Sequence, residues 1–252
     1  MDWCLRLASA PLGCDMNKTR FHLFASRLHK WLALFAGIQI ILWFASGAYM
    51  SFMPIKEIRG EHLIDRHAAI AIPAKSDLSG LSAALARVPK TSNVEVLAVN
   101  GETFALLHIG NGKTVRVDTA TGNVLPLLDA DTAKQVVLGA WTGAKPAVRK
   151  TTLLATEPGD YRGDLPVWQV ELADREGTRA YVSPDSGKIL AVRTDNWRVF
   201  DLMWGLHIMD WSGRENTNSV WLFGFAFAAL LMALMGLVLL IMRWPLRRRK
   251  RV

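Results

Sequence analysis

Two histidines beside long uncharged segments are the residues whose type and position could do chemistry. His29 closely precedes the segment from Trp31 to Ile55, and His207 lies shortly before the segment from Asn216 to Met242. Ionisable side chains close to a bilayer are functional candidates by default, and a histidine ring nitrogen is an axial ligand of haem iron in many proteins. We therefore take His29 and His207 as candidate cofactor-binding residues, with haem b as the candidate cofactor.

A purely structural role is the alternative for both histidines. Trp31 follows His29, and Trp204 and Trp211 flank His207, as expected where helices meet the lipid headgroups. The histidines would then only cap or anchor helices. Haem with two histidine ligands needs both at one depth, whereas a hydrocarbon layer of ~30 Å separates His29 from His207. A parallel homodimer would resolve this by pairing each histidine with its copy.

No other set of residues predicts catalysis or a metal site, and we assign no catalytic residue and no metal ligand. The sequence has no zinc motif, phosphate-binding loop or glycine-rich dinucleotide loop. His62 and His67 are spaced so that they do not share a helical face, and His108 lies in a strand-like segment. Cys4 and Cys14 precede the first apolar segment, where the cytoplasm would keep them reduced, so disulfides are not expected.

The two uncharged segments predict two transmembrane helices, since each exceeds the roughly 20 apolar residues that a spanning helix needs. The net charge is +3 over residues 1–30, −1 over residues 56–215 and +6 over residues 243–252. Positive flanks stay in the cytoplasm. We therefore expect both termini in the cytoplasm and the central region in the periplasm of a bacterial inner membrane. The basic charge belongs to these flanks, which argues against a nucleic-acid-binding surface.

An internal repeat divides the central region into two units. The segment Val117–Leu125 recurs 65 residues later as Val182–Leu190. Each copy has the pattern of a strand, a polar turn and a second strand, with Gly122 and Gly187 where a positive φ is expected. Apolar stripes at helical spacing precede the strand-like runs of both units. Each unit is therefore predicted to be a helix packed on a small antiparallel sheet.

These features resemble the PepSY module and PepSY-associated transmembrane proteins. The resemblance lies in the Asp-x-x-Thr-Gly-x-Val-Leu turn at residues 118–125, in the second copy over residues 166–190, and in the contexts Leu-His-Lys-Trp-Leu and Trp-Gly-Leu-His-Ile-Met-Asp-Trp around the two histidines. It covers about residues 20–245. It implies an α+β exported region of two PepSY-like units, anchored by two transmembrane α-helices. Two departures are that Ser183 stands at the position of Asp118 and that larger relatives in siderophore and ferric-iron reduction have more spans.

The expected organisation has seven parts in chain order. They are a cytoplasmic segment at 1–30 (disordered over 1–15), a transmembrane helix at 31–53, a connector with the first PepSY-like unit at 54–128, the second unit at 129–195, an interfacial helix and loop at 196–215, a transmembrane helix at 216–242 and a basic cytoplasmic tail at 243–252. Met16 also resembles a start site.

Two functions of different classes follow from these expectations. The first is a non-catalytic binding or accessory component of envelope iron and siderophore handling, whose periplasmic module binds a periplasmic or membrane protein. The alternative is a haem-bearing electron-transfer subunit of an inner-membrane ferric or siderophore reductase, with His29 and His207 as ligands in a homodimer. Whether the chain is an enzyme stays open at this point, and a haem spectrum would distinguish the two.

Overall fold

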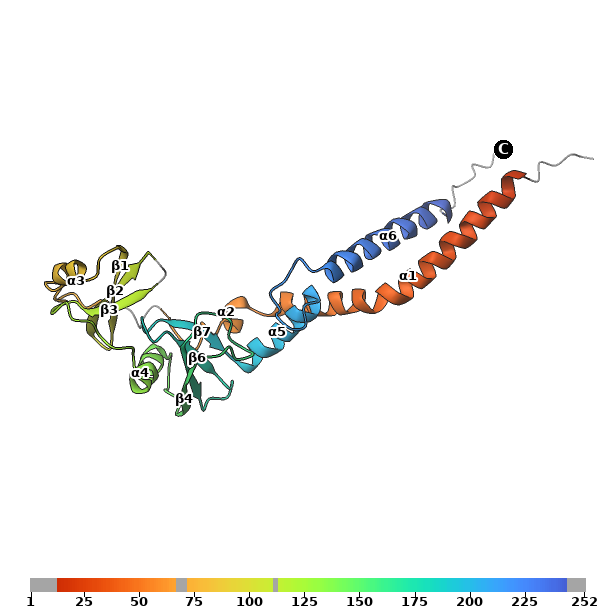
Figure 1. Ribbon diagram of the computed structural model, residues 1–252. Coiled ribbons are helices and arrows are strands. Elements are labelled where there is room, and N and C mark those ends of the chain that lie inside the picture. Colours follow the sequence, from red (N-terminus) through yellow and green to blue (C-terminus); the bar gives the residue numbers. More distant parts are fainter. Residues whose placement is uncertain (1–12, 67–71, 111–112, 244–252) are drawn as a thin grey trace, which may run out of the picture. The chain divides into compact units, whose positions relative to one another are not determined.

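The computed structural model describes residues 13–66, 72–110 and 113–243 (Figure 1). The chain divides into two compact units. One unit, Ser51–Leu202, is called the domain below. The other, called the membrane unit, combines Met1–Met50 with Met203–Val252. The architecture is α+β, with two antiparallel sheets in the domain.

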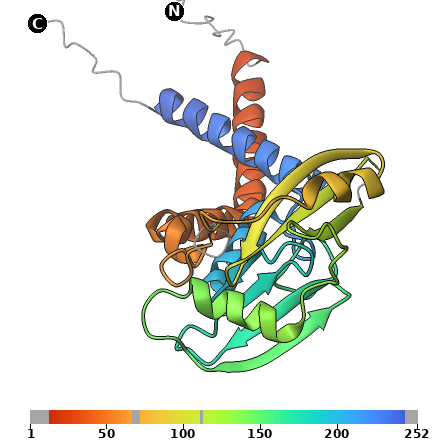
Figure 2. The same ribbon diagram turned by 90° about the vertical axis from the view of Figure 1, so that its left-hand side faces the viewer.

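The first sheet of the domain has the order β1-β2-β3, with β1 at Thr91–Val99, β2 at Glu102–Ile109 and β3 at Thr114–Asp118. Helix α3, Leu81–Arg87, precedes it and lies across one face (Figure 2). Because side chains alternate along a strand, Ala105 and Leu107 pack with Ala84 of α3. Phe104 and Leu106 instead join the main core. Strand β2 is therefore buried on both faces.

The second sheet has the order β4-β5-β6-β7, with β4 at Val148–Leu154, β5 at Val167–Leu172, β6 at Arg179–Val182 and β7 at Ile189–Arg193. Helix α4, Ala130–Ala140, precedes it, and Asp129 caps this helix by accepting a hydrogen bond from the Thr132 amide at 2.8 Å. The core cluster contains Leu97 of β1 together with Val170 of β5 and Val137 of α4. The two helix-then-sheet units of the repeat are thus present as elements, but they share one core.

The repeated turns have the same backbone conformation. Gly122 and Gly187 both have φ of +71°. The Gly122 amide donates to the Asp118 carbonyl at 2.9 Å, and the Gly187 amide donates to the Ser183 carbonyl at 2.9 Å. The prediction of equivalent turns with a positive φ at both glycines is confirmed.

The membrane unit contains the long helices α1, Gly13–Phe52, and α6, Val220–Arg243. Helix α6 is long and apolar enough to cross a membrane over Val220–Ile241. Helix α1 is bent by 50° between Ser26–Leu34 and Ala36–Phe52, and it is a second candidate if these parts form one span. Among the described residues there is thus one candidate span, or two with the bent helix.

Helix boundaries in the membrane unit differ from the expected ones. Helix α1 begins at Gly13, inside the segment expected to be disordered, and residues 1–12 lie outside the described part. Helix α6 begins at Val220 rather than at residue 216, because the Ser219 hydroxyl caps it by accepting from the Leu222 amide at 3.1 Å. The short helix α2, Ile55–Ile58, follows α1 and belongs to the domain. Helix α5, Asp195–Ile208, occupies most of the segment expected to hold an interfacial helix.

Candidate functional site

His207 is held at the end of α5 by two consecutive residues of α1. Its Nδ1 lies 3.1 Å from the Ser46 hydroxyl oxygen. A Cβ added at Gly47 would lie 3.4 Å from Cε1 of the His207 ring. Ser46 is fully buried. The absent side chain of Gly47 therefore lets the ring lie against the backbone of α1.

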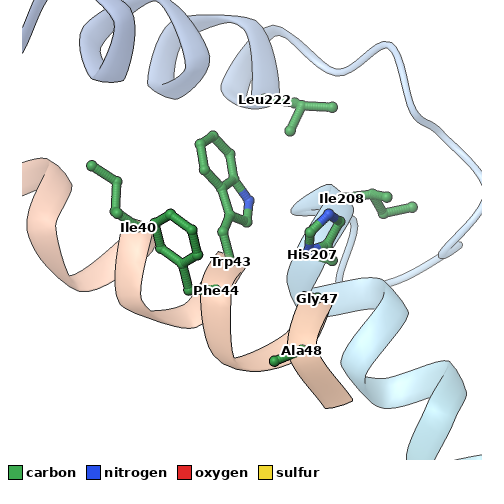
Figure 3. A pocket seen from close by; sticks show the side chains of 8 residues that line it. All are labelled: Ile40, Trp43, Phe44, Gly47, Ala48, His207, Ile208 and Leu222. Carbon is green, nitrogen blue, oxygen red and sulfur yellow. The ribbon is translucent and has the colours of Figure 1, made fainter. Parts of the chain in front are cut away.

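A cavity of about 670 Å³ lies beside this ring (Figure 3). Its walls are almost entirely apolar and come from α1, the end of α5 and the first turn of α6: Ile40, Trp43, Phe44, Gly47, Ala48, His207, Ile208 and Leu222. The indole nitrogen of Trp43 is buried and has no hydrogen-bond partner within the described residues. In Figure 3 this nitrogen lies on the edge of the indole towards His207. The cavity thus combines apolar walls with two nitrogen-bearing rings.

The loop after His207 is organised by Asp210. Its carboxylate accepts hydrogen bonds from the backbone amides of Gly213 at 3.1 Å, Glu215 at 3.0 Å and Asn216 at 3.0 Å. These amides lower the pKa of Asp210 to about 2, the Asn216 and Glu215 amides contributing most. Although Asp210 lies three residues after His207, the described partner of the His207 ring is Ser46, and Asp210 holds the connection between α5 and α6.

Asp201, which lies on α5 before His207, is engaged within the domain. Its carboxylate forms an ion pair with Arg162 at 3.3 Å, and the side chain is almost fully buried. Burying a carboxylate without such a partner would be strongly unfavourable. Asp201 therefore belongs to the packing of the domain.

His29 lies on α1 at a different place from His207. Its Nδ1 is buried and has no hydrogen-bond partner in the described part of the chain. A Cβ added at Gly236 of α6 would lie 4.0 Å from the Cε1 atom of His29. Gly47, which touches His207, follows His29 by 18 residues, or ~27 Å of helix. The structure does not bring the two candidate histidines together.

Gln39 adds a second unpaired donor on the face of α1 that carries Trp43 and Ser46. It is 8% exposed, and its Nε2 has no partner among the described residues. Residues 39, 43 and 46 are spaced by four and three positions, so they share one helix face. Helix α6 carries no side-chain oxygen that could accept from these donors. Unpaired polar groups of this kind are costly in hydrocarbon.

The remaining histidines considered from the sequence lie in ordinary surface contacts or outside the described residues. His62 lies 3.0 Å from the Glu176 carboxylate, and His108 lies 3.8 Å from that of Glu95. His67 falls in the part that the structure does not describe. Within the described residues, no three His, Cys, Asp or Glu side chains are grouped so that they could hold a metal ion.

Sequence reasoning missed a buried polar network in the domain. Asp160 accepts from the Tyr181 hydroxyl at 2.6 Å and from Arg179 at 3.1 Å, while Gln169 donates to the Tyr181 hydroxyl at 2.7 Å. Burial acts to raise the pKa of Asp160, but the bonds from Tyr181 and Arg179 lower it on balance. Arg198 of α5 adds a contact at 3.4 Å. The network connects α5 to the second sheet. No short sequence motif predicts it.

Comparison with known proteins places the chain in a family. A family described as "PepSY-associated TM region" matches residues 26–252. The chain belongs to this family. It is accordingly a membrane protein with a PepSY-associated region. No curated protein and no solved structure matches it.

Proposed function

We propose that this PepSY-associated protein holds haem b in its membrane unit and passes electrons outward across a bacterial inner membrane. Family membership and the candidate span α6 support the membrane location. The basic flanks support cytoplasmic termini and a periplasmic domain. The bent helix α1 would supply the second span. The two helix-then-sheet units of the domain would be tandem PepSY-like modules.

His207 carries this proposal because one ring nitrogen is held and the ring borders a cavity. A ligating histidine typically has its second nitrogen hydrogen-bonded, and Ser46 provides this contact at 3.1 Å. The cavity volume of about 670 Å³ falls in the range of about 300–1,000 Å³ that is usual for cofactor sites. The indole nitrogen of Trp43 has no hydrogen-bond partner among the described residues, so it adds a donor that suits an acceptor such as a haem carboxylate. The residues of this site fit the group.

His29 is the second proposed ligand, and it needs a further partner. Its Nδ1 is unpaired in the described chain, and it lies far from His207 along α1. In a parallel homodimer each histidine would face its copy at its own depth. The proposed partners are therefore a second copy of the chain, the lipid bilayer, and a periplasmic or membrane protein that accepts electrons.

The residues of the membrane unit would have distinct tasks in this function. Bound haem would supply reversible one-electron chemistry at its iron. Ser46 and Gly47 hold the His207 ring, and the apolar walls formed by Trp43, Phe44 and Leu222 exclude water. A dry environment strengthens the electrostatic interactions of the group inside it. The resemblance to siderophore and ferric-iron reductases points to iron uptake as the setting.

The test is the visible spectrum of the full-length protein purified in detergent. We expect a Soret band that shifts on dithionite reduction, because each bound haem changes its iron redox state. His207→Ala and His29→Ala should each remove one haem, and the surviving haems should differ in midpoint potential. His62→Ala is the matched control, since His62 pairs with Glu176 in the domain. A colourless wild type, or a double variant with the wild-type spectrum, overturns the haem proposal.

A non-catalytic accessory role in envelope iron or siderophore handling is the second candidate. It is favoured by edge strands in the two sheets: β1 and β4 each pair with one strand only within the described residues. Such an edge can add an extended peptide from a partner. Co-purification from native membranes, with a spectrum of the same sample, distinguishes the candidates. A colourless sample with a stoichiometric protein partner supports the accessory role.

A further inference from the structure

The hydrogen bonds of Ser46 determine which nitrogen of His207 carries a proton. The Ser46 hydroxyl oxygen lies 2.6 Å from the Leu42 carbonyl oxygen and 3.2 Å from the Trp43 carbonyl oxygen. A carbonyl oxygen only accepts, and a serine hydroxyl has one hydrogen to give. The short contact to Leu42 therefore takes this hydrogen, as serines inside helices commonly bond back to the preceding turn.

The Ser46 oxygen must then act as the acceptor in its contact with His207. The distance from this oxygen to Nδ1 is 3.1 Å, which is a normal N–H···O length. The imidazole therefore carries its proton on Nδ1 and its lone pair on Nε2. In a neutral imidazole the two nitrogens always divide these roles.

Gly47 fixes the ring in place from the same turn of α1. A Cβ at this position would lie 3.4 Å from Cε1 and 3.9 Å from Nδ1 of His207. The first distance is at the near limit of ordinary contact, so a larger side chain would push the ring away from Ser46. The small residue at position 47 and the hydroxyl at position 46 thus act on the same imidazole.

We propose that Ser46 is a positioning residue that sets the tautomer of His207 and presents Nε2 as the ligating nitrogen. The part concerning ligation rests on the proposed haem function, but the tautomer does not. An acceptor at Nδ1 also increases the basicity of a ligating imidazole. Loss of this acceptor should therefore weaken electron donation to a bound iron and favour its reduced state.

The experiment is nuclear magnetic resonance of full-length, haem-free protein labelled at histidine. It is carried out in detergent at a pH high enough for free imidazole to be neutral. The His207 signals, assigned with His207→Ala, should show the Nδ1–H tautomer in the wild type. Ser46→Ala should shift them towards a tautomer mixture, and Ser46→Thr should retain the wild-type pattern. The double variant Ala45→Ser/Ser46→Ala moves the hydroxyl by one position and should behave like Ser46→Ala. An Nε2–H tautomer in the wild type, or no change in Ser46→Ala, overturns the proposal.

Redox titration of haem-loaded protein provides the second readout. Ser46→Ala should give the His207 haem a more positive midpoint potential, and leave that of the His29 haem unchanged. An unchanged potential at both haems contradicts the positioning role. A wild type that shows the expected tautomer but binds no haem would contradict the proposed function and leave the role of Ser46 in the tautomer supported.

Discussion

At the scale of residues, each candidate histidine lies against a glycine of a neighbouring helix. His207 meets Gly47 of α1, and His29 meets Gly236 of α6. The two environments differ at Nδ1, which has a serine partner in His207 and none in the described surroundings of His29. If both histidines bind haem, the ring of His207 is already held in one orientation, whereas that of His29 is not. The difference would appear as unequal affinities and potentials.

Asp210 gives a pH-dependent prediction at this scale. Its pKa is lowered from 3.8 to about 2 by backbone amides, so the folded state favours the carboxylate. The stabilisation is fully present above pH ~4 and is lost as the pH falls towards 2. Between these values the melting temperature should fall less steeply in Asp210→Ala than in the wild type, as measured by circular dichroism. Asp131→Ala, at an exposed acid in the first turn of α4, is the control. Parallel pH profiles of the wild type and Asp210→Ala would contradict this role.

At the scale of elements, the two repeated turns share one backbone geometry. The turn at Gly187 joins β6 to β7, whereas the turn at Gly122 follows β3 and leads to an isolated bridge at Val124. Their close surroundings differ, however. A Cβ at Gly122 would lie 2.5 Å from the Gly80 carbonyl oxygen, whereas one at Gly187 would lie 2.6 Å from a methyl group of Val99. A backbone oxygen cannot rotate away as a side chain can. The turn at Gly122 therefore tolerates an added side chain less well than the turn at Gly187.

Alanine substitutions at the positive-φ glycines test this ranking. Gly101→Ala should cost about 1–2 kcal/mol from the left-handed conformation alone, because no atom of the described residues lies within 4 Å of the added Cβ. Gly187→Ala should cost more, and Gly122→Ala most, since a clash adds to the strain. Denaturant unfolding of the full-length protein measures the three values. Equal costs at all three positions would show that the close contacts do not matter.

At the scale of the whole molecule, charge is distributed by segment. The net positive charge lies at the two ends of the chain, while residues 56–215 are nearly neutral. This distribution determines the expected orientation, since basic flanks are retained on the cytoplasmic side. The family match over residues 26–252 includes both flanking segments of the domain.

Reporter fusions test the orientation. A reporter that is active only in the cytoplasm should be silent when fused after Val192 and active when fused after Val252. The reason is that, in the proposed topology, one span precedes the first site and two precede the second. Equal expression of both fusions, checked by immunoblot, is the control. Activity at Val192 would reverse the proposed topology.

The local features of this fold could be predicted from the sequence. The strand-like segment that holds His108 is part of β2, and the repeat located the turns at Gly122 and Gly187, because these signals lie within a few neighbouring residues. The contact between Ser46 and His207 could not be predicted, since 161 residues separate them. Ser46 is noticeable in the sequence only as a hydroxyl inside an apolar run, next to a glycine.

In the domain, too, contacts between distant segments could not be predicted from the sequence. The network around Asp160 joins residues from several segments, none of which has a motif of its own. The shared core was not expected either, because each repeat unit has a helix that could cover its own sheet. Only the packing of Leu97 and Phe104 with the second sheet and α4 shows that both faces of the first sheet are covered.

The shared core also has a consequence for the order of events during synthesis. A chain emerges from its N-terminus, so strands β1 to β3 are complete before α4 and β4 to β7 exist. Until then, Leu97, Val99, Phe104 and Leu106 lack the partners from α4 and the second sheet that cover most of the face that they later bury. For the time needed to make some 70 more residues, at about 5–20 residues per second, the half-made domain presents an apolar sheet face to its surroundings. A chaperone that binds exposed apolar surface would protect the partly made domain during this time.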